Sequence, residues 1–194
     1  MGESQEKAKI EAENRKKELE IKVDIVSKMA EICGSALGPS YFIYLREKTI
    51  STPAEKEAVN EVTNKILTDV FKVYTLLRSY KSEENIIKAW EDYERVLVRL
   101  TFASSFYLHK DRSPDEKVKL ASLLIEINKY LSNNNLIDDF SDDIKKKWER
   151  LTTDKTLTEL WTFDSNLWEE VADKLSNQGD KIIENFLNSC IKIS

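Results

Sequence analysis

The chain has 194 residues, of which 34% are charged and 41% hydrophobic, and its formal net charge is −5. This length suits one domain with an ordinary core, and the negative charge argues against nucleic-acid binding, because Lys and Arg hold a phosphate backbone. No apolar run approaches the ~20 residues of a membrane-spanning helix, and the absence of glycine between Pro39 and Gln178 excludes glycine-rich phosphate-binding loops from that stretch.

The N-terminal pattern predicts one long helix over residues 3–37. Residues 1–18 are almost wholly polar, and opposite charges four residues apart predict an exposed helical extension. These pairs are Glu3/Lys7, Glu11/Arg15, Glu13/Lys17 and Glu18/Lys22. From Leu19 onward, apolar side chains recur at steps of three and four and predict a packing stripe. The stripe consists of Leu19, Val23, Val26, Ala30, Cys33 and Leu37. Gly34 and Gly38 are expected to break or bend the helix.

A short segment after this helix is apolar on every side. It contains Tyr41, Phe42, Ile43, Tyr44 and Leu45. Two interpretations stay open: a buried helical turn, or an exposed patch that would mark an interaction site. Tyr41, Phe42 and Tyr44 are therefore candidate interaction residues.

Capping boxes mark two helix starts. Thr52 and Ser113 each precede a proline, and Glu55 and Glu116 follow them three residues later. The hydroxyl accepts from the amide of the third helical residue, whose carboxylate accepts from the cap amide. A further helix start is expected near Ser82. Apolar periodicity then predicts helices over about 53–79, 83–108 and 114–132. Because the loops between them are short, neighbouring helices are expected to run antiparallel. The last of them carries Leu120, Leu124, Ile127 and Leu131 on one face.

The C-terminal third predicts shorter helices, over about 142–151, 155–175 and 180–192, after the run Ser132–Asn135. Tryptophan gathers here, at Trp148, Trp161 and Trp168. Two interpretations stay open for these side chains: they fill the core, or they line a groove for a peptide or an apolar ligand.

Two acidic patterns are candidates for metal binding. Asp138, Asp139 and Asp142 fit the DDxxD pattern that holds magnesium against a diphosphate, although a helix start capped by Asp139 or Ser141 explains the same residues. Glu91 and Glu94 form an ExxE pattern, which periodicity places on a solvated helix face.

No other catalytic or metal-binding set is recognisable. His109 is the only histidine and stands at a predicted helix end, where it faces the helix dipole. Cys33 and Cys190 form neither a disulfide framework nor a zinc site. We therefore expect no cofactor and a reducing cytoplasm, and a polar helix directly after Met1 leaves open a membrane tether outside this chain.

The predicted fold is all-α: an antiparallel bundle of four long helices (about 19–37, 53–79, 83–108 and 114–132) with shorter C-terminal helices packed against it. Residues 19–194 would form a single domain and residues 1–18 its charged extension. Three functions stay open. The first is a non-enzymatic interaction or scaffold module that binds a protein partner or itself. The second is a binding protein for an apolar or aromatic small molecule. The third is a magnesium-dependent phosphate enzyme that uses one of the two acidic patterns.

Overall fold

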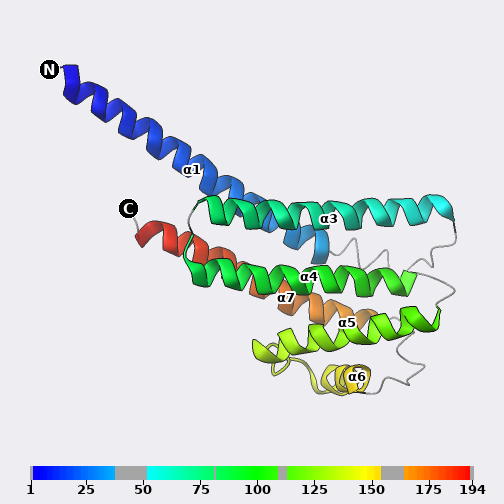
Figure 1. Ribbon diagram of the computed structural model, residues 1–194. Coiled ribbons are helices and arrows are strands. Elements are labelled where there is room, and N and C mark those ends of the chain that lie inside the picture. The colour runs from blue at the N-terminus through cyan, green and yellow to red at the C-terminus, as the bar shows by residue number, and fades with distance from the viewer. Residues whose placement is uncertain (1, 38–51, 81, 109–112, 154–163, 193–194) are drawn as a thin grey trace.

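The computed structural model describes residues 2–37, 52–80, 82–108, 113–153 and 164–192, which form helices packed against one another (Figure 1). The helices are Gly2–Leu37 (α1), Pro53–Ser79 (α3), Glu84–Leu108 (α4), Pro114–Asn133 (α5), Asp142–Thr153 (α6) and Ser165–Lys192 (α7). The described residues contain no strand, and this confirms the predicted all-α bundle. Within the same residues, no helix is both long and apolar enough to cross a bilayer.

Helix α4 lies at the centre of the bundle. It packs against α1, α3, α5 and α7, while α6 packs against α5 and α7. In Figure 1, α3, α4 and α5 run in alternating directions, as their short connections predict. Side chains from all these helices join in one apolar core, and Trp90, Tyr93 and Leu97 of α4 are fully buried in it.

Both predicted capping boxes are present. The amide of Glu55 donates to Thr52 Oγ1 at 3.3 Å, and the amide of Thr52 donates to the Glu55 carboxylate at 3.0 Å. The matching bonds between Ser113 and Glu116 measure 3.3 and 2.7 Å. Since each cap satisfies amides that have no partner inside the helix, α3 and α5 begin where the sequence predicts.

Helix α5 confirms its predicted buried face, which consists of Leu120, Leu124, Ile127 and Leu131. The helix ends in the asparagine run. Asn134 is its C-cap, and Asn135 has a φ of 56°, in the left-handed region that asparagine tolerates better than most residues.

Helix α1 confirms the predicted N-terminal helix, and its buried face includes Cys33 and Leu37 of the predicted stripe, with Val26 half-buried beside them. Its buried side chains are Ile25, Met29, Ile32, Cys33, Ala36 and Leu37. Leu19 and Val23 are 61% and 59% exposed, and Ala30 is also exposed, so the predicted stripe is wrong at these positions. The helix carries apolar side chains on two faces, and α3, α4 and α7 cover one of them. Gly34 does not break the helix, because α1 continues through it to Leu37, and Gly38 lies outside the described residues.

Helix α7 is longer than predicted. The division into 155–175 and 180–192 is wrong, because one helix runs from Ser165 to Lys192 through Gly179, and α7 is thus a further long member of the bundle. A glycine inside a helix costs about 1 kcal/mol relative to alanine, but here it allows close packing. A Cβ atom at Gly179 would lie 2.6 Å from Tyr93 Oη and 2.9 Å from Cys33 Sγ.

Candidate functional site

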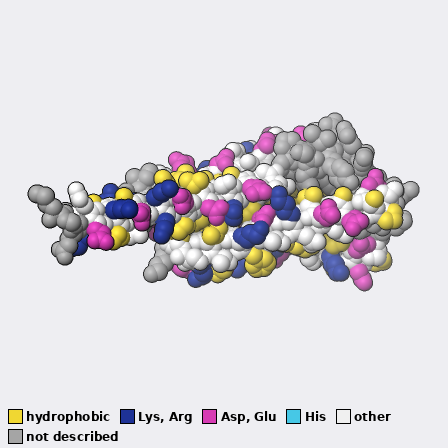
Figure 2. Space-filling model, turned by 90° about the horizontal axis from the view of Figure 1, so that it is seen from above, with side chains coloured by type: hydrophobic (Ala, Val, Ile, Leu, Met, Phe, Trp, Pro, Cys, Tyr) yellow, Lys and Arg dark blue, Asp and Glu magenta, His cyan; other side chains and the backbone are white. Residues whose placement is uncertain are grey.

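The first half of α1 projects from the bundle (Figure 1). Every side chain from Gln5 to Ile21 is exposed, and we call residues 5–21 the arm. Residues 2–17 extend about 24 Å beyond Glu18, at the helical rise of ~1.5 Å per residue. The large apolar side chains of Ile10, Leu19 and Ile21 are open to solvent on it. Figure 2 shows basic and acidic side chains alternating along this part of the molecule.

The arm meets the bundle at a cluster around Tyr80, the C-cap residue of α3. The Tyr80 hydroxyl donates to Glu18 Oε1 at 3.1 Å, and Lys22 Nζ lies 2.9 Å from the same oxygen. Hydrogen bonds from Lys22 and then Tyr80 lower the pKa of the Glu18 carboxyl. The Tyr80 ring also meets Phe186 of α7 edge-on, with 5.9 Å between ring centres. Three helices therefore converge on one ring where the arm begins.

Few charges of the arm are paired within the chain. Of the four predicted ion pairs, Glu18–Lys22 is present at 2.9 Å. A pair that was not predicted joins Lys16 and Glu20 at 3.9 Å. Within the described residues, Glu11 and Lys17 have no ion-pair partner. Their charges are therefore available to another molecule.

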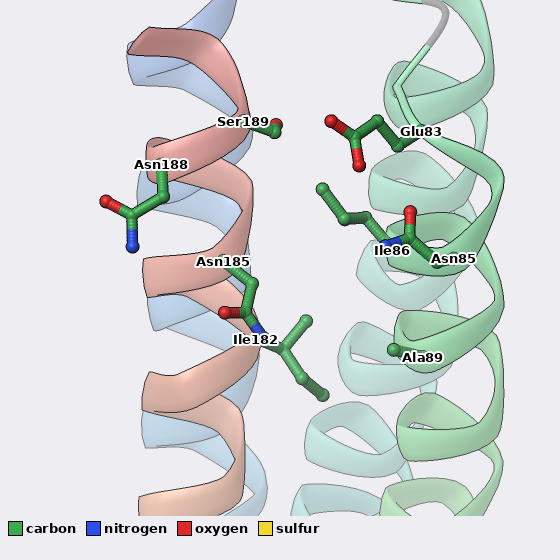
Figure 3. Close-up of a pocket in the computed structure, with 8 residues that line it drawn as sticks. All are labelled: Glu83, Asn85, Ile86, Ala89, Ile182, Asn185, Asn188 and Ser189. Carbon is green, nitrogen blue, oxygen red and sulfur yellow. The ribbon is translucent and has the colours of Figure 1, made fainter. Parts of the chain in front are cut away.

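A pocket of about 310 Å³ lies between the start of α4 and the last turns of α7 (Figure 3). Its lining residues are Glu83, Asn85, Ile86, Ala89, Ile182, Asn185, Asn188 and Ser189. Figure 3 shows Glu83, which directly precedes α4, facing Ser189 of α7, with Ile86 and Ile182 lower down between the two helices. Amide, hydroxyl and carboxylate groups on an apolar floor suit a ligand that forms hydrogen bonds. The sequence did not predict this pocket, which requires α7 to continue past Gly179.

A second, open hollow of about 500 Å³ lies between α4 and α5. Its lining residues are Phe102, Phe106, Val118, Lys119, Ser122, Leu123 and Glu126. Phe102 and Val118 are partly or largely exposed, so this surface is apolar and shallow. Glu126 at its margin pairs with Arg99 of α4 at 3.3 Å.

The predicted aromatic residues fall into two groups. Trp148 and Trp168 are each 1% exposed and meet edge-on, with 6.1 Å between ring centres. The Trp148 indole N–H donates to Asn128 Oδ1 of α5 at 2.8 Å, which satisfies its one donor. Both side chains lie in the interior of the bundle and do not form part of its outer surface. The other candidates, Tyr41, Phe42, Tyr44 and Trp161, lie outside the described residues, as does His109.

The DDxxD residues lie at a helix start. Ser141 Oγ accepts from the amide of Ile144 at 3.5 Å, and Asp142 stands in the first turn of α6. Lys145 Nζ donates to the backbone carbonyl of Asp138 at 2.8 Å. Within the part of the chain that the structure describes, no three His, Cys, Asp or Glu side chains converge as metal ligands would. The capping interpretation accounts for the contact of Ser141 and for the position of Asp142 in the first turn of α6.

The ExxE residues are more enclosed than the sequence predicts. Glu91 and Glu94 are half-buried, which corrects their placement on a fully solvated face. Burial, and next the nearby Glu91 carboxylate, raise the pKa of the Glu94 carboxyl to about 7. A carboxyl with such a pKa changes its charge near neutral pH.

A buried polar contact joins α1, α4 and α7 around Gly179. The Tyr93 hydroxyl donates to the Leu175 carbonyl at 2.8 Å, and Cys33 Sγ lies 3.5 Å from the same hydroxyl. Burial raises the pKa of the Cys33 thiol and also that of Tyr93. Both groups are therefore neutral at physiological pH, and a neutral thiol is a poor nucleophile. This contact links residues 60 positions apart, so no local pattern could have revealed it.

Comparison of the chain with known protein families, with curated proteins and with solved structures found no match.

Proposed function

We propose that this chain is a non-enzymatic helical interaction module whose contact element is the arm of α1. The observation that carries this proposal is the exposure of every side chain from Gln5 to Ile21 on a helix that is continuous with the core. A lone helix of this length is marginal in water, and a helix without a packed face needs many charge pairs or a partner to persist. A second molecule that covers Leu19 and its neighbours would supply that packing.

The remainder of the chain is suited to hold the arm in a fixed orientation. The Tyr80 cluster fixes the base of the arm on α3 and α7 through the hydrogen bond to Glu18, the approach of Lys22 Nζ to the Tyr80 ring and the aromatic contact with Phe186. Below it, α1 continues into the core through Ile25, Met29 and Ile32. The direction of the arm is thus set by the bundle, and a partner meets an oriented helix, which lowers the entropy lost on binding.

A photo-crosslinking amino acid placed in the arm tests this proposal. Ala12 is the test position, and the exposed Glu149 of α6 is the matched control on the bundle surface. In the native cells we expect crosslinked protein adducts from position 12 and none from position 149. An adduct with another protein and an adduct with a second copy of this chain would each support the proposal. Equal crosslinking from both positions, or none from position 12, would refute the proposed role of the arm.

The pocket between α4 and α7 supports a second candidate, a small-molecule binding protein. Its volume of about 310 Å³ is at the lower end of the range for ligand pockets. Its amide and hydroxyl groups favour a polar ligand over the apolar one that the sequence suggested. Native mass spectrometry of the purified chain tests this candidate: extra mass that the Asn185→Leu variant loses would support it. A bare mass for both proteins would count against it.

A further inference from the structure

The arm carries an apolar seam with a seven-residue spacing. Ala12, Leu19 and Val26 are seven residues apart, which places them on one side of a helix. Leu19 is exposed, whereas Val26 is half-buried and packs against the core. The next position of the series is Cys33, which is buried in α1 where Gly179 of α7 approaches it. The seam thus runs from the exposed arm to the edge of the face that α1 buries in the bundle.

The two edges of this seam carry opposite charges. Glu11 and Glu18 precede the seam residues Ala12 and Leu19 by one position and lie on one edge. Lys9 and Lys16 lie three positions before the same seam residues, on the other edge. These are the flanking positions that set partner choice and orientation in paired helices. When two such helices run parallel, the acidic edge of one meets the basic edge of the other, whereas antiparallel helices bring like charges together.

The distribution of charge also favours a second copy as the occupant. Residues 3–22 contain six acidic and six basic side chains, so their net charge is zero, and the remainder of the chain carries the whole net charge of −5. Two bundles repel each other, but two arms do not. A neutral arm with both signs shows no preference for a strongly acidic or strongly basic partner.

We infer that two copies of this chain associate in parallel through their arms, with Leu19 against Leu19 and Glu11 of each copy beside Lys16 of the other. This inference rests on the proposed function and names its partner. Arg15 falls in the seam between Ala12 and Leu19. The Arg15 side chains of the two copies therefore face each other, and their like charges weaken the pairing. The dimer is therefore weak, with a dissociation constant on the order of 100 µM.

Analytical ultracentrifugation of the full chain and of charge-reversed variants tests the pairing. Glu11→Lys and Lys16→Glu each place like charges at both contacts, and each weakens the dimer roughly tenfold. A mixture of the two variants restores opposite charges at both contacts and forms a heterodimer at about the wild-type strength. Since both side chains are exposed on the arm, neither reversal disturbs the bundle. The variant Arg15→Leu fills the seam and tightens the dimer at least about tenfold.

The matched control reverses the same charges on the outer side of the arm. Glu13 and Lys17 are exposed and lie about 110° and 150° around the helix from the seam, at ~100° per residue. The double variant Glu13→Lys with Lys17→Glu leaves the association unchanged. If it weakens the dimer as much as the reversals at residues 11 and 16, the seam is wrong.

The remaining outcomes distinguish self-association through the arm from the broader proposal of an interaction module. A chain that stays monomeric up to about 1 mM, while position 12 crosslinks to a different protein, overturns self-association and leaves the interaction module intact. A monomer that gives no adduct at position 12 overturns both. A dimer that the Glu11→Lys variant strengthens is antiparallel, which also overturns the inference as stated.

Discussion

Replacing Gly179 by alanine separates two physical effects of opposite sign. In an ordinary helix interior the change would stabilise the protein by about 0.5–1 kcal/mol, because alanine has the better helix propensity and restricts the unfolded chain. At this position the new methyl group would lie 2.6 Å from Tyr93 Oη and 2.9 Å from Cys33 Sγ. Real Cβ atoms do not approach other atoms so closely, so the helices must move apart.

The expected result is a loss of stability. Tyr93 is fully buried, and its rigid ring cannot swing aside as an exposed lysine would. Overpacking of this kind costs about 1–3 kcal/mol, and displacement of the ring also stretches its 2.8 Å bond to the Leu175 carbonyl, worth about 1 kcal/mol. After the gain in propensity is subtracted, Gly179→Ala should destabilise the fold by about 1–3 kcal/mol.

The chain supplies a matched control in Gly34. It lies in the last turn of α1, is exposed, and has no atom within 4 Å of its Cβ position. Gly34→Ala should therefore stabilise the fold by about 0.5–1 kcal/mol. Urea denaturation followed by far-ultraviolet circular dichroism measures both variants, and equal m-values would show that the unfolded states are comparable.

A double-mutant cycle identifies the atoms responsible. Tyr93→Phe removes the hydroxyl, so Gly179→Ala should cost less in that background than in the native chain. If Gly179→Ala is as stable as Gly34→Ala, the close approach of α1, α4 and α7 described above is incorrect.

Three further predictions concern single side chains. The pKa of the Glu94 carboxyl is raised to about 7 in the folded chain. The protonated carboxyl therefore stabilises the fold fully at a pH below its pKa in the unfolded chain, and this stabilisation is lost as the pH rises through 7. Each pKa unit is worth about 1.4 kcal/mol, but partial solvent access reduces the effect, so Glu94→Gln should stabilise the fold by about 1–2 kcal/mol at pH 8 and by almost nothing near pH 4. Asn128→Ala leaves the buried indole N–H of Trp148 without its acceptor and should cost about 1–3 kcal/mol in urea denaturation, whereas the exposed neighbour variant Lys129→Ala should change stability by less than about 0.5 kcal/mol. Ser113→Ala removes the cap of α5 and should cost about 1 kcal/mol by thermal denaturation; no change would mean that another group satisfies the Glu116 amide.

Local chemistry made part of the fold predictable. The boxes at Thr52 and Ser113 involve groups three residues apart, and the structure contains the same bonds. The buried face of α5 was also predictable, since Leu120 and Leu131 belong to one apolar series at steps of three and four residues. In this helix the spacing of the apolar series was enough to predict which side chains are buried.

Where a helix carries apolar side chains on two faces, the sequence alone does not show which face is buried. In α1 the series through Leu19 and Val23 and the series through Ile25 and Met29 are both apolar, and only the placement of α3, α4 and α7 buries the second. Gly179 presents the same difficulty. Its local preference favours a helix end, and contacts with residues far away in the sequence override it.

The candidate sites follow the same division. The charged extension was predictable from its composition, and the arm is that extension together with the next few residues. The pocket between α4 and α7 was not, because Glu83 and Ser189 come together only through the packing of two distant helices.

The arm and the pocket meet at the same structural element. Tyr80 binds Glu18 at the base of the arm and contacts Phe186, which stands next to the pocket residue Asn185 on α7. A helix is stiff along its axis, so a shift at Phe186 moves the last turns of α7 together. The pairing of two arms would act on Glu18, and occupation of the pocket would act on Asn185, so both events bear on the orientation of one aromatic ring. If the arm binds a partner and the pocket binds a ligand, as proposed above, Tyr80 is the residue that contacts the elements of both sites.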